Sequence, residues 1–221
     1  ILFTSALHGS EWQSTLYSLS FFEKIRDDVF PDKKLRDTLL NEFHIAYFPL
    51  VNVWGYNKTK EYAVTRGRLN STGTNLNRDF GNFSDVETRY IRDTVLKNKP
   101  FAFLDMHLIR SIRNRDELLI VGNVEPETKY WRNKIAKDWK AYSGLEVLLW
   151  GQEDLTKEGV ARKWIAEQPN PYTAHTLAII TEITRPCKEK TGFKEPLSPS
   201  QIYSYGQYSM YSFLKVYIKK F

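Results

Sequence analysis

Short apolar runs alternate with amphipathic stretches along almost the whole chain. Strand-like runs occupy residues 1–7, 43–51, 101–106, 118–121, 145–149 and 176–182. Helical spacing of apolar residues occurs at 11–29, 33–41, 84–97, 126–142 and 162–167. Ser198 and Pro199 add an N-cap and a first helical residue for a Tyr-rich helix that runs to the C-terminus. Strands separated by helices predict an α/β layered fold whose sheet is largely buried on both faces.

The length of the chain suits one domain. At 221 residues, a single folding unit buries about 70% of the surface of the unfolded chain. We therefore expect residues 1–221 to form one domain. The sequence opens inside a strand and without Met, so we also expect this domain to be part of a longer chain. Cys187 is the single cysteine, which excludes a disulfide within these residues.

Charge and hydropathy restrict the kinds of partner. The chain has 32 Lys and Arg against 26 Asp and Glu, a net charge of +6, which favours anionic surroundings such as a cell-wall surface. The basic residues are dispersed, and no long run of like charges indicates a nucleic-acid-binding arm. No apolar stretch reaches the roughly 20 residues that span a bilayer, and no signal peptide is recognisable. The sequence leaves the compartment open, with extracellular and cell-surface locations both compatible.

A histidine and a carboxylate three residues apart follow the first apolar run. His8 and Glu11 have ligand types that bind zinc, and a catalytic zinc usually takes three protein ligands and leaves a fourth position open. The best candidate for the third ligand is His107, which ends the run at 101–106. A His and a Glu at this spacing also arise by accident on protein surfaces, and His107 can alternatively be a core histidine with satisfied hydrogen bonds.

The segment from residue 52 to residue 80 shows no periodicity. Loops longer than about 15 residues without structure of their own are usually functional or disordered. This one carries five polar side chains of interest: Arg66, Arg68, Asn75, Asn77 and Arg78. A further carboxylate, Glu182, lies at the polar end of the last apolar run, where an ion pair with Arg185 is the structural alternative to a catalytic role.

Four motifs in this order resemble the zinc carboxypeptidases of peptidase family M14. They are H-G-S-E at 8–11, R-L-N-S-T-G-T-N-L-N-R-D-F at 68–80, D-M-H at 105–107 and T-E-I at 181–183. The resemblance spans residues 1–183, and N-L-N-R-D-F is its most specific part. It implies an α/β fold with a mixed, roughly eight-stranded sheet between helices. It also implies one Zn²⁺ held by His8, Glu11 and His107.

The same resemblance implies roles for four other residues. Glu182 matches the general base, which later acts as an acid, and Arg68 matches the arginine that stabilises the oxyanion. Arg66, in the same loop, competes for the second role. Asn77 and Arg78 match the pair that binds the terminal carboxylate of the substrate, an anion that suits the planar guanidinium fork.

The implied activity is zinc-dependent cleavage of an amide bond. The leading substrate is a peptide with a free carboxylate near the scissile bond, and cell-wall peptides are one such class. An N-acyl amino acid deacylase of the same fold is the alternative enzyme. A module that has lost its catalysis and binds peptide or wall ligands is the alternative without turnover.

Two positions depart from the family pattern. Asn75 stands where many relatives have an acidic residue that orients a zinc-binding histidine. Its amide oxygen can still accept from an imidazole N–H, but losses of this kind cost about 10-fold to 100-fold in metal affinity or activity. The stretch at 159–164 contains no tyrosine to match the one that covers the substrate in carboxypeptidases, and Tyr172 is the nearest replacement.

Overall fold

The computed structural model describes residues 1–59, 66–110, 118–123, 125–150, 158–185 and 197–218. Its centre is a six-stranded sheet with the order β2-β1-β3-β6-β4-β5. The strands are β1 (Leu2–Ser5), β2 (Ala46–Phe48), β3 (Ala102–Arg110), β4 (Leu118–Gly122), β5 (Val147–Trp150) and β6 (Leu177–Arg185). The first four in spatial order are parallel to one another, and β4 runs antiparallel to β6. The predicted mixed sheet is confirmed, but the expected count of roughly eight strands was wrong.

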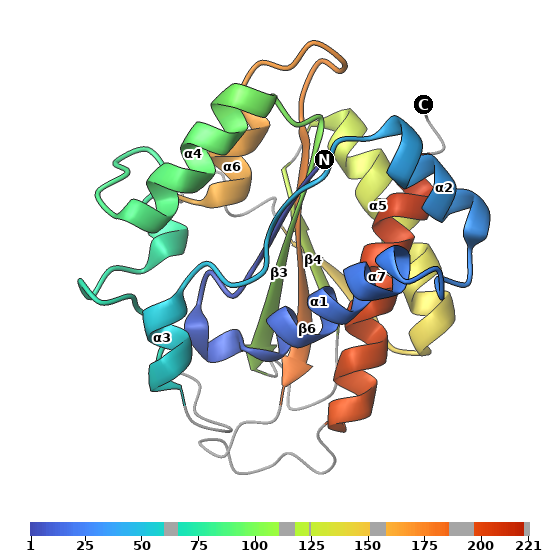
Figure 1. The fold of residues 1–221 in the computed structure, drawn as a ribbon, viewed down its shortest axis with the longest axis horizontal. Coiled ribbons are helices and arrows are strands. Elements are labelled where there is room, and N and C mark those ends of the chain that lie inside the picture. The colour runs from blue at the N-terminus through green and yellow to red at the C-terminus, as the bar shows by residue number, and fades with distance from the viewer. Residues whose placement is uncertain (60–65, 111–117, 124, 151–157, 186–196, 219–221) are drawn as a thin grey trace.

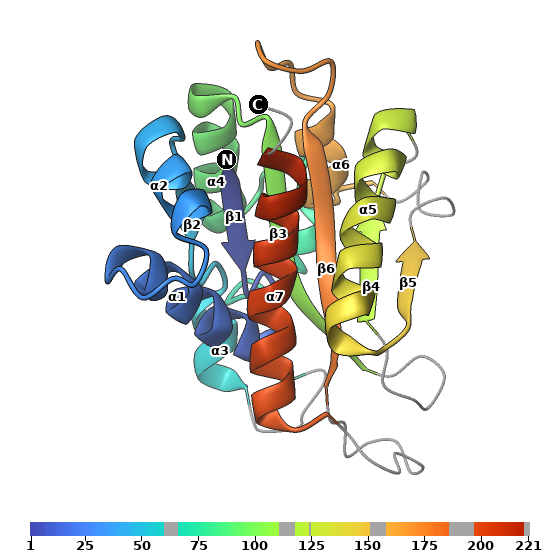
Figure 2. The same cartoon turned by 90° about the vertical axis from the view of Figure 1, so that its right-hand side faces the viewer.

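Helices cover both faces of the sheet (Figures 1 and 2). On one face lie α1 (Gln13–Arg26), α2 (Lys33–Glu42), α5 (Pro126–Ser143) and α7 (Pro199–Ile218). On the other lie α4 (Val86–Asn98) and α6 (Ala161–Ala166). Each face has its own core, because successive strand residues point to opposite sides. Phe3 and Leu104 pack into the core under α1 and α7, and Leu2 and Phe103 into the core under α4 and α6.

The Tyr-rich helix α7 is a packing element. It lies between α1 and α5 against β3 and β6. Tyr217 is buried, and the tyrosines at 203, 205, 208 and 211 are partly buried against the same core. A Cβ at Gly206 would lie 2.4 Å from the Tyr17 ring, so only glycine permits this approach of α7 to α1. In the described part of the chain, every helix is too short or too polar to cross a membrane.

The apolar run at 43–51 forms a much shorter strand than expected. Only Ala46–Phe48 pairs, on one side with β1, and all three residues are partly exposed. As an edge strand, β2 has a neighbour on one side only, so its length does not follow from its hydrophobicity. Pro49, which follows, has no N–H to continue the ladder.

The segment at 52–80 contains more regular structure than its sequence predicts. It begins with α3 (Val53–Lys58), where the Asn52 side chain accepts a hydrogen bond from the Gly55 N–H at 2.8 Å. Near its end, η2 (Leu76–Arg78) forms one 3₁₀ turn capped by Asn75. Both elements are shorter than two helical turns, so neither produces a recognisable hydrophobic period.

The aspartate of N-L-N-R-D-F caps helix α4. Residues 84–87 have the S-x-x-E spacing of a capping box, but Ser84 does not form one, because Asp85 occupies the N-cap position. Instead, the buried Asp79 carboxylate accepts hydrogen bonds from the Ser84 and Asp85 N–H groups, both at 3.0 Å, and from the Thr88 hydroxyl. Burial raises the pKa of Asp79, but these hydrogen bonds outweigh it and lower the pKa below its usual value.

We expect Asp79→Asn to destabilise the domain by about 1.5 to 3 kcal/mol at neutral pH, the usual contribution of hydrogen bonds to a charged group. The folded-state pKa is lowered, so this stabilisation is complete above the unfolded pKa of about 3.9. It is lost as the pH falls through the folded value. Urea unfolding should show that the difference in the free energy of unfolding between wild type and variant narrows from about pH 5 to pH 3. Asp93 of α4 is exposed, so Asp93→Asn is the control. A stability difference between wild type and Asp79→Asn that does not change with pH would contradict the role of the Asp79 carboxylate.

Candidate metal centre

A tight turn after β1 brings His8 and Glu11 together. Ala6 has a φ of 51°, in the left-handed region, and turns the chain out of the strand. Ser14 at the start of α1 accepts from the Ala6 N–H at 3.1 Å and donates to the Glu11 carbonyl at 2.7 Å. The 3₁₀ turn η1 (Gly9–Glu11) is thereby held against β1. His8 and Glu11 lie at its two ends, and both are buried.

Two neighbouring strands bring the other predicted residues to the same edge of the sheet. His107 in β3 and Glu182 in β6 are direct partners in a parallel ladder, and β3 also pairs with β1. The arrowheads of β3 and β6 in Figure 1 point to this edge. The carboxyl ends of parallel strands are where ligand sites of open α/β sheets form.

Glu11 lies between two imidazoles. Its Oε1 is 2.8 Å from Nδ1 of His8, and its Oε2 is 2.8 Å from Nδ1 of His107. One ligand atom from each of the three residues lies within 4.8 Å of the others, and all three residues are buried. Two imidazole nitrogens and one carboxylate oxygen are the ligand set of many catalytic zinc sites. The residues therefore fit the metal that the sequence predicts.

The other nitrogen of each imidazole also has a partner. Nε2 of His8 lies 3.1 Å from Oδ1 of Asn75, the contact expected of a neutral amide. Nε2 of His107 lies 2.6 Å from Oδ2 of Asp105. The sequence predicts no role for Asp105, although this residue precedes His107 by two positions. In a strand, that spacing places both side chains on the same face.

The buried charges shift one another strongly. Burial lowers the pKa of His8 and outweighs the opposing effect of Glu11. Burial also disfavours the charged form of His107, but the carboxylates of Asp105 and Glu11 outweigh it and raise its pKa well above the usual value. In turn, the two histidines hold the pKa of Glu11 well below its usual value despite burial. Desolvation raises the pKa of Glu182 to about 7.

Arg68 is the arginine that reaches the centre. Its Nη1 lies 3.3 Å from Oε1 of Glu11. Arg66 is exposed, and its Nε donates to the Lys58 carbonyl instead. Geometry therefore favours Arg68 over Arg66 for a role at the metal centre.

Glycine contacts hold η1 against α3 and the loop that carries Arg68. The Ser10 N–H donates to the carbonyl of Gly67 at 3.0 Å. A Cβ at Gly9 would lie 2.2 Å from the Tyr56 nitrogen, and one at Gly55 would lie 2.3 Å from the Gly67 carbonyl oxygen. Backbone atoms cause these clashes, so no side-chain rotation relieves them.

We expect Gly9→Ala to push η1 away from α3 and to displace Glu11 from the histidines. Overpacking of this kind costs about 1 to 3 kcal/mol, and the disturbed ligands should lose at least about 10-fold in zinc affinity. Unfolding and zinc competition measurements test both effects. Gly144→Ala, at a left-handed helix C-cap with open space around it, is the control, with lower stability and unchanged zinc affinity. Equal zinc affinity in Gly9→Ala and wild type would contradict this account.

Asn77 and Arg78 lie beside the stretch at 159–164. Asn77 is buried, and its Oδ1 accepts from the Ala161 N–H at 3.0 Å. Arg78 is exposed, donates to the Asn77 carbonyl, and lines a pocket of about 400 Å³ with Gly159 and Trp164. Among the described residues that line this pocket, none is a member of the histidine and glutamate cluster.

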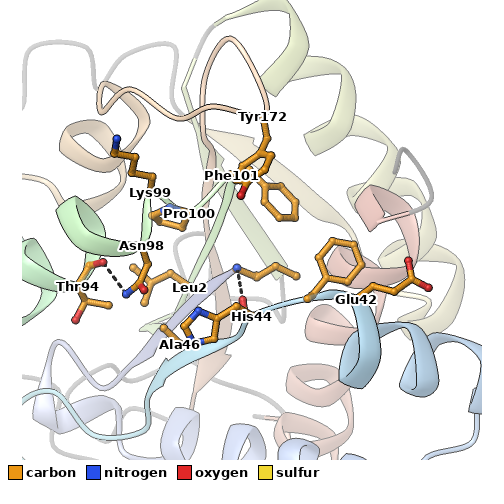
Figure 3. Close-up of a pocket in the computed structure, with 12 residues that line it drawn as sticks. Leu2, Glu42, His44, Ala46, Thr94, Asn98, Lys99, Pro100, Phe101 and Tyr172 are labelled. Atoms are coloured by element: carbon orange, nitrogen blue, oxygen red, sulfur yellow. Dashed lines mark hydrogen bonds between the residues drawn. The ribbon is translucent and has the colours of Figure 1, made fainter.

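Tyr172 and His44 lie away from the metal centre. Both line a pocket at the amino ends of β1 and β3, together with Phe101 (Figure 3). There the Ile1 nitrogen donates to the His44 carbonyl at 2.8 Å. Tyr172 is therefore at the opposite end of the sheet from His107, and the suggestion that it replaces the covering tyrosine was wrong. The side chain of Arg185, the suggested partner of Glu182, lies outside the described residues.

Comparison with known protein families decides the relationship that this geometry suggests. The model of the family described as zinc carboxypeptidase matches residues 1–147, about two thirds of the chain and including His8, Glu11 and His107. The chain belongs to the zinc carboxypeptidase family. No curated protein matches it in a search by sequence.

Solved metallocarboxypeptidases share the fold. The metallo-carboxypeptidase from Pseudomonas aeruginosa aligns over 100% of this chain and 57% of its own, with a TM-score of 0.73 and 16% identity. That from Burkholderia cenocepacia also covers 100% and 57%, with a TM-score of 0.70 and 14% identity. Bovine thrombin-activatable fibrinolysis inhibitor covers 100% and 83%, with a TM-score of 0.68 and 17% identity. This chain thus spans little more than half the length of the first two.

Proposed function

We propose that residues 1–221 form a single zinc-dependent metallohydrolase domain that cleaves an amide bond, most simply as a carboxypeptidase. The observation that carries this proposal is the buried cluster of His8, Glu11 and His107, whose ligand atoms lie within 4.8 Å of one another. The position of Glu182 supports the proposal, because Glu182 and His107 are direct neighbours in the ladder between the parallel strands β3 and β6. A structural zinc site closes its coordination with four protein ligands, whereas three protein ligands leave a position for the reaction.

The side chains around the cluster divide the chemical work. When bound, zinc acts as a Lewis acid that activates water and polarises the scissile carbonyl. Glu182 takes the proton from the attacking water and passes it to the leaving nitrogen, as general base and then general acid. Arg68, whose Nη1 is near Glu11, stabilises the negative charge that develops on the carbonyl oxygen.

We propose that the substrate is a peptide with a free carboxylate near the scissile bond. Asn77 and Arg78 would bind that carboxylate, because they lie two and three residues after Asn75, which contacts His8. A guanidinium fork suits a carboxylate. The Pseudomonas aeruginosa enzyme was solved with (2-guanidinoethylmercapto)succinic acid, itself a carboxylic acid.

Cell-wall peptides are the class that we would test first. The murein-tripeptide amidase of Escherichia coli O157 shares the fold, with a TM-score of 0.54, 14% identity, and 97% and 80% coverage of the two chains. The net charge of +6 favours an anionic polymer as the surroundings of the substrate.

An N-acyl amino acid deacylase is the second candidate. The 159–164 stretch includes no tyrosine to enclose the terminal side chain of a substrate. This feature favours a pocket that binds the terminal residue less tightly than a typical carboxypeptidase does. A binding module without turnover is the third candidate, and it would have no use for Glu182.

A substrate panel separates these candidates. Purified chain is incubated with short peptides bearing a free C-terminus, their C-terminal amides, N-acyl amino acids and cell-wall stem peptides. We expect release of an amino acid from the free peptides, loss of activity in chelator, and recovery on addition of zinc. Preference for N-acyl amino acids would favour the deacylase. Zinc-free protein that binds stem peptides and cleaves none of the panel would overturn the enzymatic proposal.

A further inference from the structure

We propose that Asp105 supplies the negative charge that positions the metal-binding residue His107, in place of an acidic residue at position 75. This inference rests on the proposed function, because it concerns the same metal. The residues that contact the far nitrogens of the two histidines have different roles. The neutral Asn75 fixes which ring nitrogen of His8 carries the hydrogen. Asp105 orients His107 and also strengthens it as a ligand.

Asn75 has only one orientation that suits its neighbours. Its Oδ1 accepts from the Asn77 backbone N–H at 3.1 Å, and a backbone N–H can only donate. The atom that faces His8 is therefore the amide oxygen, and Nε2 of His8 must carry a hydrogen to contact it at 3.1 Å. Nδ1 of His8, which faces Glu11, is then the nitrogen that can give its lone pair to a metal. A neutral amide is enough to select this tautomer.

Asp105 is held on both of its oxygens. Oδ1 accepts from the Thr4 hydroxyl at 2.8 Å, and Oδ2 lies 2.6 Å from Nε2 of His107. Thr4 and Asp105 are direct partners in the ladder between β1 and β3. Both residues are fully buried, so water screens this contact very little. A carboxylate in this position fixes the ring and raises the basicity of the ligand nitrogen on its far side.

The negatively charged partner therefore contacts His107, whereas the family pattern predicts an acidic residue at position 75, beside His8. The contact between His107 and Asp105 is shorter by 0.5 Å than that between His8 and Asn75 (2.6 against 3.1 Å). A short contact to a charged acceptor is the stronger of the two. Asn at position 105 would offer an amide group with donors of its own. An amide N–H facing Nε2 would favour the proton on Nδ1, the nitrogen that has to bind the metal.

Four proteins test this inference by zinc affinity, measured by competition with a chromophoric chelator. They are wild type, Asp105→Asn, Asn75→Asp and the double variant. We expect Asp105→Asn to weaken zinc binding by about 10-fold to 100-fold. Asn75→Asp keeps the acceptor for Asn77 and should bind zinc at least as tightly as wild type. The double variant, which moves the carboxylate to the other histidine, should recover most of the loss.

The outcomes distinguish this inference from the function on which it rests. Wild type that does not bind zinc contradicts the proposed function. Wild type that binds zinc, with Asp105→Asn equally tight, overturns the role of Asp105 alone. If the double variant binds zinc as weakly as Asp105→Asn does, the role of Asp105 is purely structural, and the inference is also overturned. Should Asp105→Asn not fold, Thr4→Val removes one anchor of the carboxylate, and unchanged zinc affinity in that variant would contradict the inference.

Discussion

Glu182→Gln is expected to lower kcat by about 10²-fold to 10⁴-fold, the usual contribution of a general base and acid. Glutamine keeps the shape of the side chain but cannot take a proton from water. Glu182 is a ladder partner of His107 and is not part of the cluster of potential ligands. Zinc content and affinity should therefore stay close to those of wild type.

Steady-state kinetics on whichever substrate of the panel is cleaved, together with the zinc content of the same preparations, measure this effect. Glu23→Gln, an exposed glutamate of α1, is the matched control and should change neither quantity. Hydrolysis at the wild-type rate by Glu182→Gln would remove Glu182 from its role. A parallel loss of zinc would mean that the carboxylate acts on the metal and not on the proton.

His107→Gln is expected to weaken zinc binding by more than about 100-fold, because the loss of a direct ligand exceeds the loss of an outer partner. Activity should fall with the metal. Glutamine retains a polar group between Asp105 and Glu11, which limits the cost of two buried carboxylates without a partner. Circular dichroism of the metal-free protein establishes that the variant is folded before its zinc affinity is measured.

The control for His107→Gln is another histidine that lies outside the cluster. His175 is exposed, just before β6, and His175→Gln should bind zinc as wild type does. Equal affinities of the wild type and His107→Gln would contradict the assignment of His107 as a ligand. Equal losses in the two variants would show that the effect is not specific to the cluster.

The layered fold could be predicted because its elements carry strong local patterns. Helices α1, α5 and α7 begin and end within a few residues of the predicted bounds. Each is longer than three turns, so its hydrophobic period is unambiguous. The strands β3 and β6 are buried on both faces and appear as continuous apolar runs.

The features of the fold that were predicted wrongly depend on contacts between residues that are distant in sequence. The length of β2 depends on its edge position beside β1, which the apolar run at 43–51 does not encode. The capping residue of α4 is Asp79, six residues before the N-cap Asp85. A carboxylate that caps from outside the local S-x-x-E pattern has no simple sequence signature.

The sequence predicts which residues form the candidate site better than it predicts the contacts that those residues make. Strand-end positions and motif order predict His8, Glu11 and His107, and the structure brings them together. The strand-end position of His107 was wrong, because β3 continues past it to Arg110. No role for Asp105 is predicted from the sequence, although its spacing from His107 on a strand places both side chains on one face. The contact with Thr4 could not be foreseen, because it requires the register between β1 and β3.

Zinc-edge anomalous diffraction from crystals of the wild-type protein grown with zinc tests the central claim most directly. Our account predicts one strong peak per chain, within bonding distance of Nδ1 of His8, a carboxylate oxygen of Glu11 and Nδ1 of His107, at about 2.0 to 2.2 Å. A peak elsewhere, or fully ordered side chains of these three residues with no peak between them, would contradict it.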